Sequence, residues 1–189
     1  MHTRILSSVM RHVQINEREI DFFETLLKPR TIRKRQYLLQ AGDICRYETF
    51  VNEGLLRAYS VDEKGQERIV MFAQEGWWTS DLYSFLTATP AVLNIEALED
   101  TSVLQLEKVD LERLYLEVPK FERLFRILFQ NAFVTHQHRI LSSMSQSAED
   151  RYRYFLQKYS GLDQRIPQHH IASFLGITPE TLSRIRNAR

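Results

Sequence analysis

Cysteine is almost absent from this chain of 189 residues, which contains a single thiol at Cys45. One thiol cannot close an intramolecular disulfide, and it cannot supply the four thiolates of an iron–sulfur cluster. Histidine is missing between positions 13 and 135, although a metal-dependent enzyme of the cupin type needs two or three imidazoles in its strands. We therefore predict no catalytic residues and no metal site, and the lack of disulfides fits a reducing, cytoplasmic location.

Long hydrophobic runs are missing as well. No segment approaches the roughly 18 apolar residues of a membrane-spanning helix, and residues 1–8 lack the apolar core of a signal peptide. Hydrophobic residues at 43% and charged residues at 26% are instead typical of a globular protein. The sequence predicts neither a membrane partner nor a bound cofactor.

The net charge of +1 hides an uneven distribution. From residue 146 onward seven basic residues face four acidic ones, a balance of +3, whereas residues 1–145 carry −2. Binding to a polyanion such as DNA is dominated by contacts from basic side chains to phosphates. The C-terminal segment is therefore the part of the chain that is better suited to nucleic acid.

Residues 167–188 have the pattern of two short helices joined by a glycine turn. Ile171 and Leu175 form an apolar i, i+4 pair on the first helix. Gly176 lies where the chain must turn, a position that commonly needs positive φ. Thr178 is the expected N-cap of the second helix, and Pro179 is its expected first residue. This arrangement predicts a helix-turn-helix.

The second of these helices would carry a polar stripe on the side away from its apolar residues Leu182 and Ile185. A carboxylate, a hydroxyl, a guanidinium and an amide on one exposed face are groups that can read base edges in a major groove. The alternative is an ordinary helical hairpin whose polar face is only solvated, and the glycine turn with its capped second helix favours DNA binding. The stripe recurs at i, i+3, i+4 and i+7 and consists of Glu180, Ser183, Arg184 and Asn187.

The rest of the chain changes its periodicity twice. Residues 16–27 form a predicted helix capped by Asn16, and residues 29–106 consist of short strands separated by glycine-containing turns. Such strands are typical of an antiparallel sandwich or barrel. Helical periodicity returns at Glu107, with a long helix predicted over residues 120–143 and another over residues 148–159.

The long predicted helix is too apolar to lie alone on a surface. Its apolar residues extend around more than one face, so one face would pack on the β-rich part and another on a second subunit. We expect Leu128 and Ala132 in that subunit interface; the alternative is burial of both faces within one chain. The apolar residues are Phe121, Leu124, Phe125, Leu128, Phe129, Ala132, Phe133, Ile140 and Leu141.

In their order these parts resemble the Crp/Fnr family of transcription regulators, named after the cyclic-AMP receptor protein and the fumarate–nitrate reduction regulator. The resemblance covers essentially the whole chain. Its most specific segments are LQAGDIC at 39–45, FVNEGLLR at 50–57, DEKGQE at 62–67 and IASFLGITPETLSR at 171–184.

The resemblance implies an α+β fold with an N-terminal antiparallel β-roll of the double-stranded β-helix or jelly-roll type. A long dimerisation helix and a C-terminal helix-turn-helix would follow. The corresponding domains are a cyclic-nucleotide-binding-like effector domain at 1–118, the dimerisation helix at 119–145 and the DNA-binding domain at 146–189. Family membership further implies a homodimer on a palindromic double-stranded operator, reoriented by a small-molecule effector, with RNA polymerase as another partner.

The same resemblance suggests roles for single residues. The Glu-x-x-Ser-Arg pattern of the oxygen-sensing branch falls on Glu180, Ser183 and Arg184. Arg184 would then donate two hydrogen bonds to guanine O6 and N7, and Glu180 would accept one from a cytosine amino group. The residues that flank this stripe and would contact phosphates are Thr178, Thr181 and Arg186.

Two features depart from the family pattern. The pairs that bind ribose and phosphate in cyclic-AMP binders align with Ser80-Asp81 and Ala91-Val92, so the arginine that would hold the phosphate is missing. We therefore expect an effector other than cyclic AMP. In addition, the sequence ends directly after the recognition helix, without the usual longer helix and β-hairpin wing. Either the DNA-binding part is minimal or the sequence is shortened.

The side chains around the expected effector pocket allow more than one interpretation. Trp77 and Trp78 stand at its entrance, and they either pack the core of the β-roll or line an apolar pocket. Asp81 is either a ligand-binding group or an exposed loop carboxylate. The rival function is a cyclic-nucleotide or other small-molecule-binding regulatory module without a DNA output.

The C-terminal histidines also leave alternatives open. His136 and His138 are two positions apart on a helix, so they point to different faces and make a poor chelate, although one of them could ligate haem. His169 and His170 begin the first helix of the motif, where they either contact phosphates or are solvated.

Overall fold

The computed structural model describes residues 2–188, and it begins with two helices, α1 (Thr3–Met10) and α2 (Glu17–Leu26). The predicted N-cap of α2 is confirmed. The Asn16 side chain accepts from the Glu19 N–H, and the Glu19 carboxylate accepts from the Asn16 N–H. Helix α1 is additional to the elements expected from the sequence.

Two four-stranded antiparallel sheets form the β-roll, which confirms the predicted α+β class. One sheet has the strand order β1-β8-β3-β6 and the other has the order β2-β7-β4-β5. The strands are β1 (Leu27–Ile32), β2 (Tyr37–Leu39), β3 (Tyr47–Glu53), β4 (Leu56–Val61), β5 (Glu67–Ala73), β6 (Trp78–Thr79), β7 (Asn94–Ala97) and β8 (Thr101–Glu107).

Gly54 allows the tight passage from β3 to β4. Its φ is +94°, in the region that favours glycine, and a Cβ at this position would lie 2.5 Å from Thr101 Oγ1. Because Thr101 begins β8, any side chain at position 54 would push that strand away from the turn.

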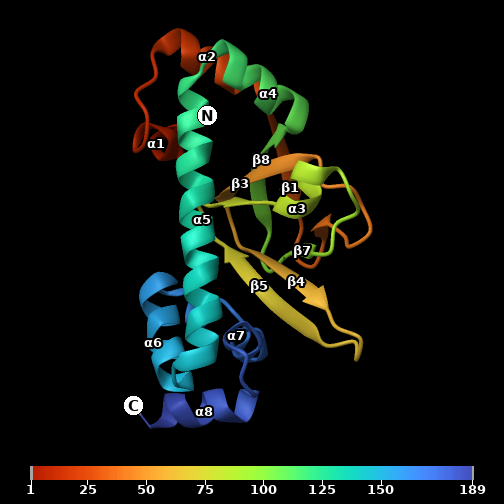
Figure 1. Cartoon of the computed structure of the whole chain (residues 1–189), viewed down its shortest axis with the longest axis vertical. Coiled ribbons are helices and arrows are strands. Elements are labelled where there is room, and N and C mark those ends of the chain that lie inside the picture. The colour runs from red at the N-terminus through yellow and green to blue at the C-terminus, as the bar shows by residue number, and fades with distance from the viewer. Residues whose placement is uncertain (1, 189) are drawn as a thin grey trace.

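A single long helix connects the two ends of the molecule. After α3 (Leu82–Thr87) and α4 (Lys108–Glu117), helix α5 (Lys120–Ser145) runs beside the β-roll from α2 and α4 at one end to the C-terminal helices at the other (Figure 1). Its length agrees with the predicted long helix. No helix among residues 2–188 is both long and apolar enough to cross a membrane.

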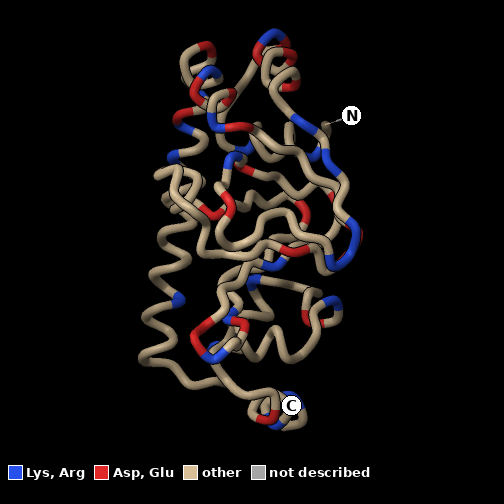
Figure 2. Tube along the Cα trace, turned by 90° about the vertical axis from the view of Figure 1, so that its right-hand side faces the viewer, with Lys and Arg blue, Asp and Glu red and all other residues tan. Residues whose placement is uncertain are grey.

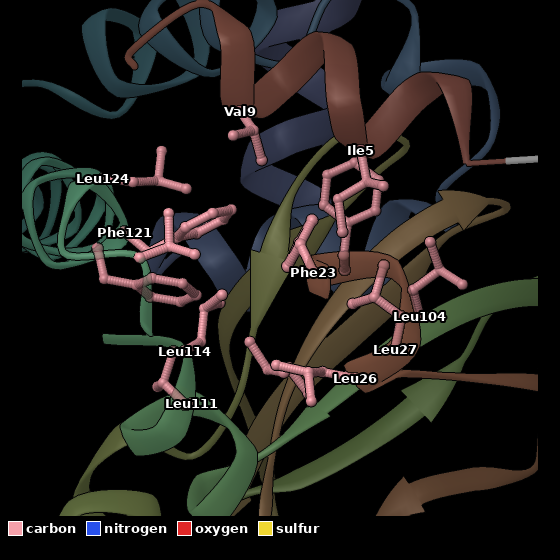
Figure 3. Packing of buried hydrophobic residues seen from close by; sticks show 14 of the residues in the cluster. Ile5, Val9, Phe23, Leu26, Leu27, Leu104, Leu111, Leu114, Phe121 and Leu124 are labelled. Carbon is pink, nitrogen blue, oxygen red and sulfur yellow. The ribbon is translucent and has the colours of Figure 1, made fainter. Parts of the chain in front are cut away.

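The first hydrophobic core fixes the beginning of α5 to the roll. Ile5 of α1, Phe23 of α2, Leu114 of α4 and Phe121 of α5 are fully buried in it and point toward one another (Figure 3). The rings of Phe23 and Phe121 lie 4.7 Å apart. Since burial of one such side chain stabilises by about 1.5–3 kcal/mol, this cluster holds the first turns of α5 firmly in place.

The C-terminal helices share a second core with the β-roll. They are α6 (Ala148–Lys158), α7 (Gln168–Leu175) and α8 (Pro179–Asn187), with a short 3-10 helix, Leu162–Gln164, between α6 and α7. Phe155 and Tyr159, at the end of the α6 segment, and Ile171 of α7 pack with Ile69 and Phe72 of β5. Residues 146–188, which belong to the segment 146–189 expected as a separate domain, are thus docked on the roll in this conformation.

Candidate nucleic-acid interface and ligand cavity

The turn between α7 and α8 has the geometry that the sequence predicts. Gly176 ends α7 with a φ of 67°, in the left-handed region. Thr178 caps α8, because its hydroxyl accepts from the Thr181 N–H at 3.2 Å, and Pro179 is the first helical residue. Leu182 is fully buried against the rest of the C-terminal helices. The helix-turn-helix is therefore formed.

The polar stripe on α8 is exposed at the end of the molecule, where α8 lies beyond the C-terminal end of α5 (Figure 1). Hydrogen bonds from its own backbone N–H and from Thr178 lower the pKa of Glu180, which keeps this carboxylate ionised. The Arg184 guanidinium donates to the Thr181 hydroxyl at 3.4 Å and is otherwise free to turn outward. The exposed members are Glu180, Ser183, Arg184 and Asn187, with Thr178 beside them, whereas Thr181 and Arg186 are half-buried.

A buried ionic cluster docks α7 on the β-roll, and sequence reasoning did not find it. Arg57 of β4 donates to Glu96 of β7 through Nε at 2.9 Å, and it also pairs with Glu67 at the start of β5. Burial alone would lower the pKa of Arg57, but the hydrogen bonds to the two carboxylates outweigh it and the pKa rises. The fourth member is His170 of α7, whose Nε2 lies 2.8 Å from Arg57 Nη1.

The position of His170 contradicts both sequence interpretations, phosphate contact and solvation, because the residue is only 8% exposed. An arginine can only donate hydrogen bonds, so Nε2 must accept and the ring is neutral. Burial, and then the neighbouring Arg57, lower the pKa of His170 to about 4. No sequence signal could have shown this contact, because the two residues are 113 positions apart.

A second ionic contact joins the same two parts of the chain. Arg165, just before α7, donates to Glu75 at 2.8 Å and to Glu99 at 2.6 Å, in the loops after β5 and β7. Ser173 of α7 accepts from the Ile69 N–H and donates to the Glu67 carbonyl of β5. These polar contacts, with the shared hydrophobic core, fix the orientation of the helix-turn-helix relative to the roll.

A cavity of about 540 Å³ lies between α5 and the β-roll and extends to the C-terminal helices. Of the predicted pocket residues, Trp77, Trp78 and Ser80 line it. The Trp78 ring centroid also lies 5.4 Å from that of Phe50 and 5.2 Å from that of Phe125. Trp78 therefore packs in the hydrophobic core and lines the cavity as well.

The other three predicted pocket residues, Asp81, Ala91 and Val92, do not line this cavity. Asp81 is neither a cavity group nor an exposed carboxylate: it is 1% exposed and accepts from the N–H groups of Ser84, Val92 and Leu93. It caps α3 and holds the loop before β7, a role that its Asp-x-x-Ser spacing could have suggested. Ala91 is buried in this loop, and the Val92 side chain is exposed.

One carboxylate and several basic groups face the cavity. Burial raises the pKa of Glu48 to about 7, although a hydrogen bond from Ser80 at 2.8 Å opposes the shift. Arg139 of α5 donates to the carbonyls of Ile69 and Val70 in β5. Lys158, the last residue of α6, also faces the cavity.

The faces of α5 differ from the expected assignment. Leu128 and Ala132, which we expected in the subunit interface, line the cavity. The face turned to solvent carries a different apolar set, and Figure 2 shows the half of the helix nearer the C-terminal end almost without charged residues. The exposed apolar residues are Phe133, Val134, Ile140, Leu141 and Met144.

The structure offers no metal centre within residues 2–188, where no three His, Cys, Asp or Glu side chains gather in a suitable arrangement. His138 stacks on Tyr154 with ring centroids 4.4 Å apart, while His136 faces the cavity. Burial raises the pKa of the Cys45 thiol to about 11, so it is a buried, unreactive side chain.

Comparison with known proteins agrees with this architecture. The cyclic nucleotide-binding domain family matches residues 29–117. The fumarate and nitrate reduction regulatory protein of Vibrio cholerae serotype O1 is 29% identical over 185 residues, covering 90% of this chain and 72% of that protein. Regulatory protein HlyX of Actinobacillus pleuropneumoniae is 26% identical over 189 residues, covering 90% of this chain and 75% of that protein.

Solved structures share the fold. FixK2 from Bradyrhizobium japonicum superposes with a TM-score of 0.74 at 21% identity, covering 86% of this chain and 83% of that one. The catabolite activator protein of Thermus thermophilus gives a TM-score of 0.59 at 23% identity, covering 96% and 85%. The molecule thus combines a cyclic-nucleotide-binding type of β-roll with a helix-turn-helix. In sequence and in fold the chain is similar to regulators of the Crp/Fnr type.

Proposed function

We propose that this protein is a sequence-specific, DNA-binding transcription regulator that works as an effector-controlled homodimer. The observation that carries the proposal is the exposed stripe of Glu180, Ser183, Arg184 and Asn187 on a helix whose start is capped and whose inner face is buried. A second helix of such a motif lies in the major groove, with its N-terminal residues against base edges.

Residues of the stripe would provide sequence specificity, and residues that flank it would provide affinity for DNA. Arg184 has the fork geometry for guanine O6 and N7, and Glu180, four positions earlier on the same face, can accept from a cytosine amino group. Phosphate contacts give affinity that does not depend on sequence. We assign these contacts to Thr178, Thr181 and Arg186, which flank the stripe.

The exposed face of α5 supports a dimer of two copies of this chain. Positions with alternating spacings of three and four residues form the seam of a two-stranded coiled coil. Val134, Leu141 and Met144 are between 57% and 79% exposed, a costly arrangement for a monomer in water. The full seam consists of Ile127, Gln130, Val134, Gln137, Leu141 and Met144.

We propose the cavity beside α5 as the effector site and the division 1–118, 119–145 and 146–189 as the functional domains. We propose an effector other than cyclic AMP, because no lysine or arginine lies between Gln74 and Glu107, where cyclic-AMP binders carry the arginine that holds the phosphate. RNA polymerase is the proposed further partner, and the cytoplasm, where the operator DNA is, is the proposed location.

The experiment for DNA recognition is selection of bound sites from random DNA with the wild type, Arg184→Ala and Arg186→Ala. We expect a palindrome with half-site centres about one helical turn apart. Arg184→Ala should lose preference at one base pair per half-site, whereas Arg186→Ala should bind all sequences more weakly and with a smaller salt dependence. An unchanged motif with Arg184→Ala would refute the assignment of the reading face, and no selected motif at all would favour a module without DNA output.

Calorimetric titration with cyclic AMP tests the statement about the effector. Each missing charged hydrogen bond weakens binding by about one to two orders of magnitude. We expect no micromolar binding, and micromolar binding that also tightens the DNA complex would refute the statement.

A further inference from the structure

The cavity between α5 and the β-roll has two chemically different ends. Toward the beginning of α5 its wall is mostly aromatic, with Trp78, Phe125 and Phe129 among the lining residues, and Arg11 and His12, directly after α1, also line the cavity. Toward the C-terminal helices the lining residues include Arg139 and Lys158. A volume of about 540 Å³ lies within the range of small-molecule sites, which are mostly apolar with a few placed polar groups.

Lys158 is a half-buried cation without a counter-ion. Among residues 2–188 it makes no salt bridge, and its ammonium lies 5.8 Å from the Trp77 ring centroid and 5.7 Å from that of Tyr159. Burial, and then repulsion from Arg139, lower the pKa of Lys158. A cation in this position is stabilised by an anion, and the chain itself does not supply one.

Arg139 strengthens the same positive end. Its guanidinium donates to the carbonyls of Ile69 and Val70 and lies 4.4 Å from the Phe174 ring centroid, again without a carboxylate partner within residues 2–188. Its pKa is lowered by burial. Glu48 is the single carboxylate on the cavity wall, and it accepts a hydrogen bond from Ser80.

We infer that the cavity binds an amphipathic organic anion, with an aromatic or other apolar body against Trp78 and Phe129 and one anionic group on Lys158 and Arg139. This inference rests on the proposed role of the cavity as the effector site, and it adds the chemical class of the effector. The anion is held by α5 and α6, whereas the phosphate-binding position of the β-roll, Ala91-Val92, has no cation.

This placement would connect the ligand to the helix-turn-helix directly. Lys158 ends α6, and Phe174 of α7 lies under the Arg139 guanidinium. An anion on these two cations would therefore touch the long helix and the C-terminal segment at once. A ligand shifts the equilibrium between a docked and an undocked helix-turn-helix only if its contacts differ between the two states.

The test uses two matched fluorescent probes on the full chain without DNA, so its result does not depend on DNA binding. 8-Anilinonaphthalene-1-sulfonate has an aromatic body and one negative charge, and N-phenyl-1-naphthylamine has the same body without the charge. We expect saturable binding of one sulfonate probe per chain, and binding of the neutral probe to the wild type at least about tenfold weaker.

Variants then locate the charge contact. Lys158→Met keeps the length of the side chain and should weaken binding of the sulfonate probe about tenfold or more, with little change for the neutral probe, which also reports that the cavity has folded. The control is Arg153→Met on the same helix, where an exposed arginine pairs with Glu149 and Asp150 outside the cavity. Its binding of both probes should equal that of the wild type.

The inference is overturned if Lys158→Met binds the sulfonate probe as the wild type does, if the neutral probe binds the wild type as tightly as the anion, or if no saturable site exists. Each of these results leaves the site selection on random DNA unaffected. Failure of the proposed regulator function would appear in that selection instead.

Discussion

Arg57 and His170 are 113 positions apart in the chain, yet Nη1 of one lies 2.8 Å from Nε2 of the other. The contact joins β4 of the roll to the first helix of the DNA-binding motif. Because Arg57 also pairs with Glu96 and Glu67, one guanidinium connects strands β4, β5 and β7 with α7.

Replacing Arg57 by methionine should destabilise the protein by about 3–5 kcal/mol. The change leaves Glu96, whose side chain is 12% exposed, as a buried charge without its partner. The measurement is the free energy of unfolding in urea. Arg68→Met is the control, because the Arg68–Asp62 pair on the surface is worth less than about 1 kcal/mol; equal losses for the two variants would contradict the role of the buried cluster.

His170 should make the stability depend on pH between about 6.5 and 4. Its pKa is near 6.5 when unfolded and about 4 when folded, so the unfolded chain takes up the proton first as the pH falls. The stabilisation is complete above pH 6.5 and is lost toward pH 4. Relative to His170→Gln, the wild type should lose about 1–2 kcal/mol between pH 7 and pH 5.

Thermal unfolding at several pH values measures this difference. The exposed neighbour provides a control, and His169→Gln should follow the wild-type pH dependence. Parallel curves for the wild type and His170→Gln would show that the ring is not held neutral by Arg57.

Glu48 should make the stability depend on pH in the opposite direction to His170. Burial raises its folded pKa to about 7, so the native protein holds a proton that the unfolded chain has already released. This contribution is present at low pH and is lost as the pH rises through 7. Glu48→Gln should therefore be more stable than the wild type at pH 8 by up to about 3 kcal/mol, with little difference near pH 4.5.

The comparison for this prediction is Glu53→Gln, an exposed carboxylate on the same strand. That variant should not gain stability at pH 8. A Glu48→Gln protein that is less stable than the wild type at pH 8 would mean that the native state needs the charged carboxylate.

The exposed seam of α5 should be the dimer interface. The double change Val134→Glu and Leu141→Glu introduces two charges per chain into this seam and should produce monomers, because a charge in a coiled-coil core cannot be solvated. Light scattering at micromolar concentration measures the mass. Ser143→Glu, on an exposed position of the same helix outside the seam, should remain dimeric. A monomeric wild type would refute the interface.

Local patterns in the sequence were sufficient for most of the elements and for their order, although they did not reveal α1. The capping of α2 by Asn16, the glycine turn at Gly176 and the Thr178 cap of α8 depend on neighbouring residues, so a single segment contains the whole cause. The alternation of strands with glycine turns likewise predicted an antiparallel sandwich or barrel. The polar stripe on α8 follows from helical periodicity once Leu182 is buried.

The tertiary structure decided which groups meet across the chain. Asp81 looked like a ligand group or a surface carboxylate, and the fold instead buries it as a cap for three backbone N–H groups. The periodicity of α5 shows apolar residues on several faces, and packing alone assigns Leu128 to the cavity and Val134 to solvent. The cations of the cavity, Arg139 and Lys158, come from two helices, and their juxtaposition depends on the docking of the C-terminal segment. The sequence by itself therefore determined the helix-turn-helix and the β-roll, because their causes are local, while only long-range packing could determine the docking cluster and the cavity.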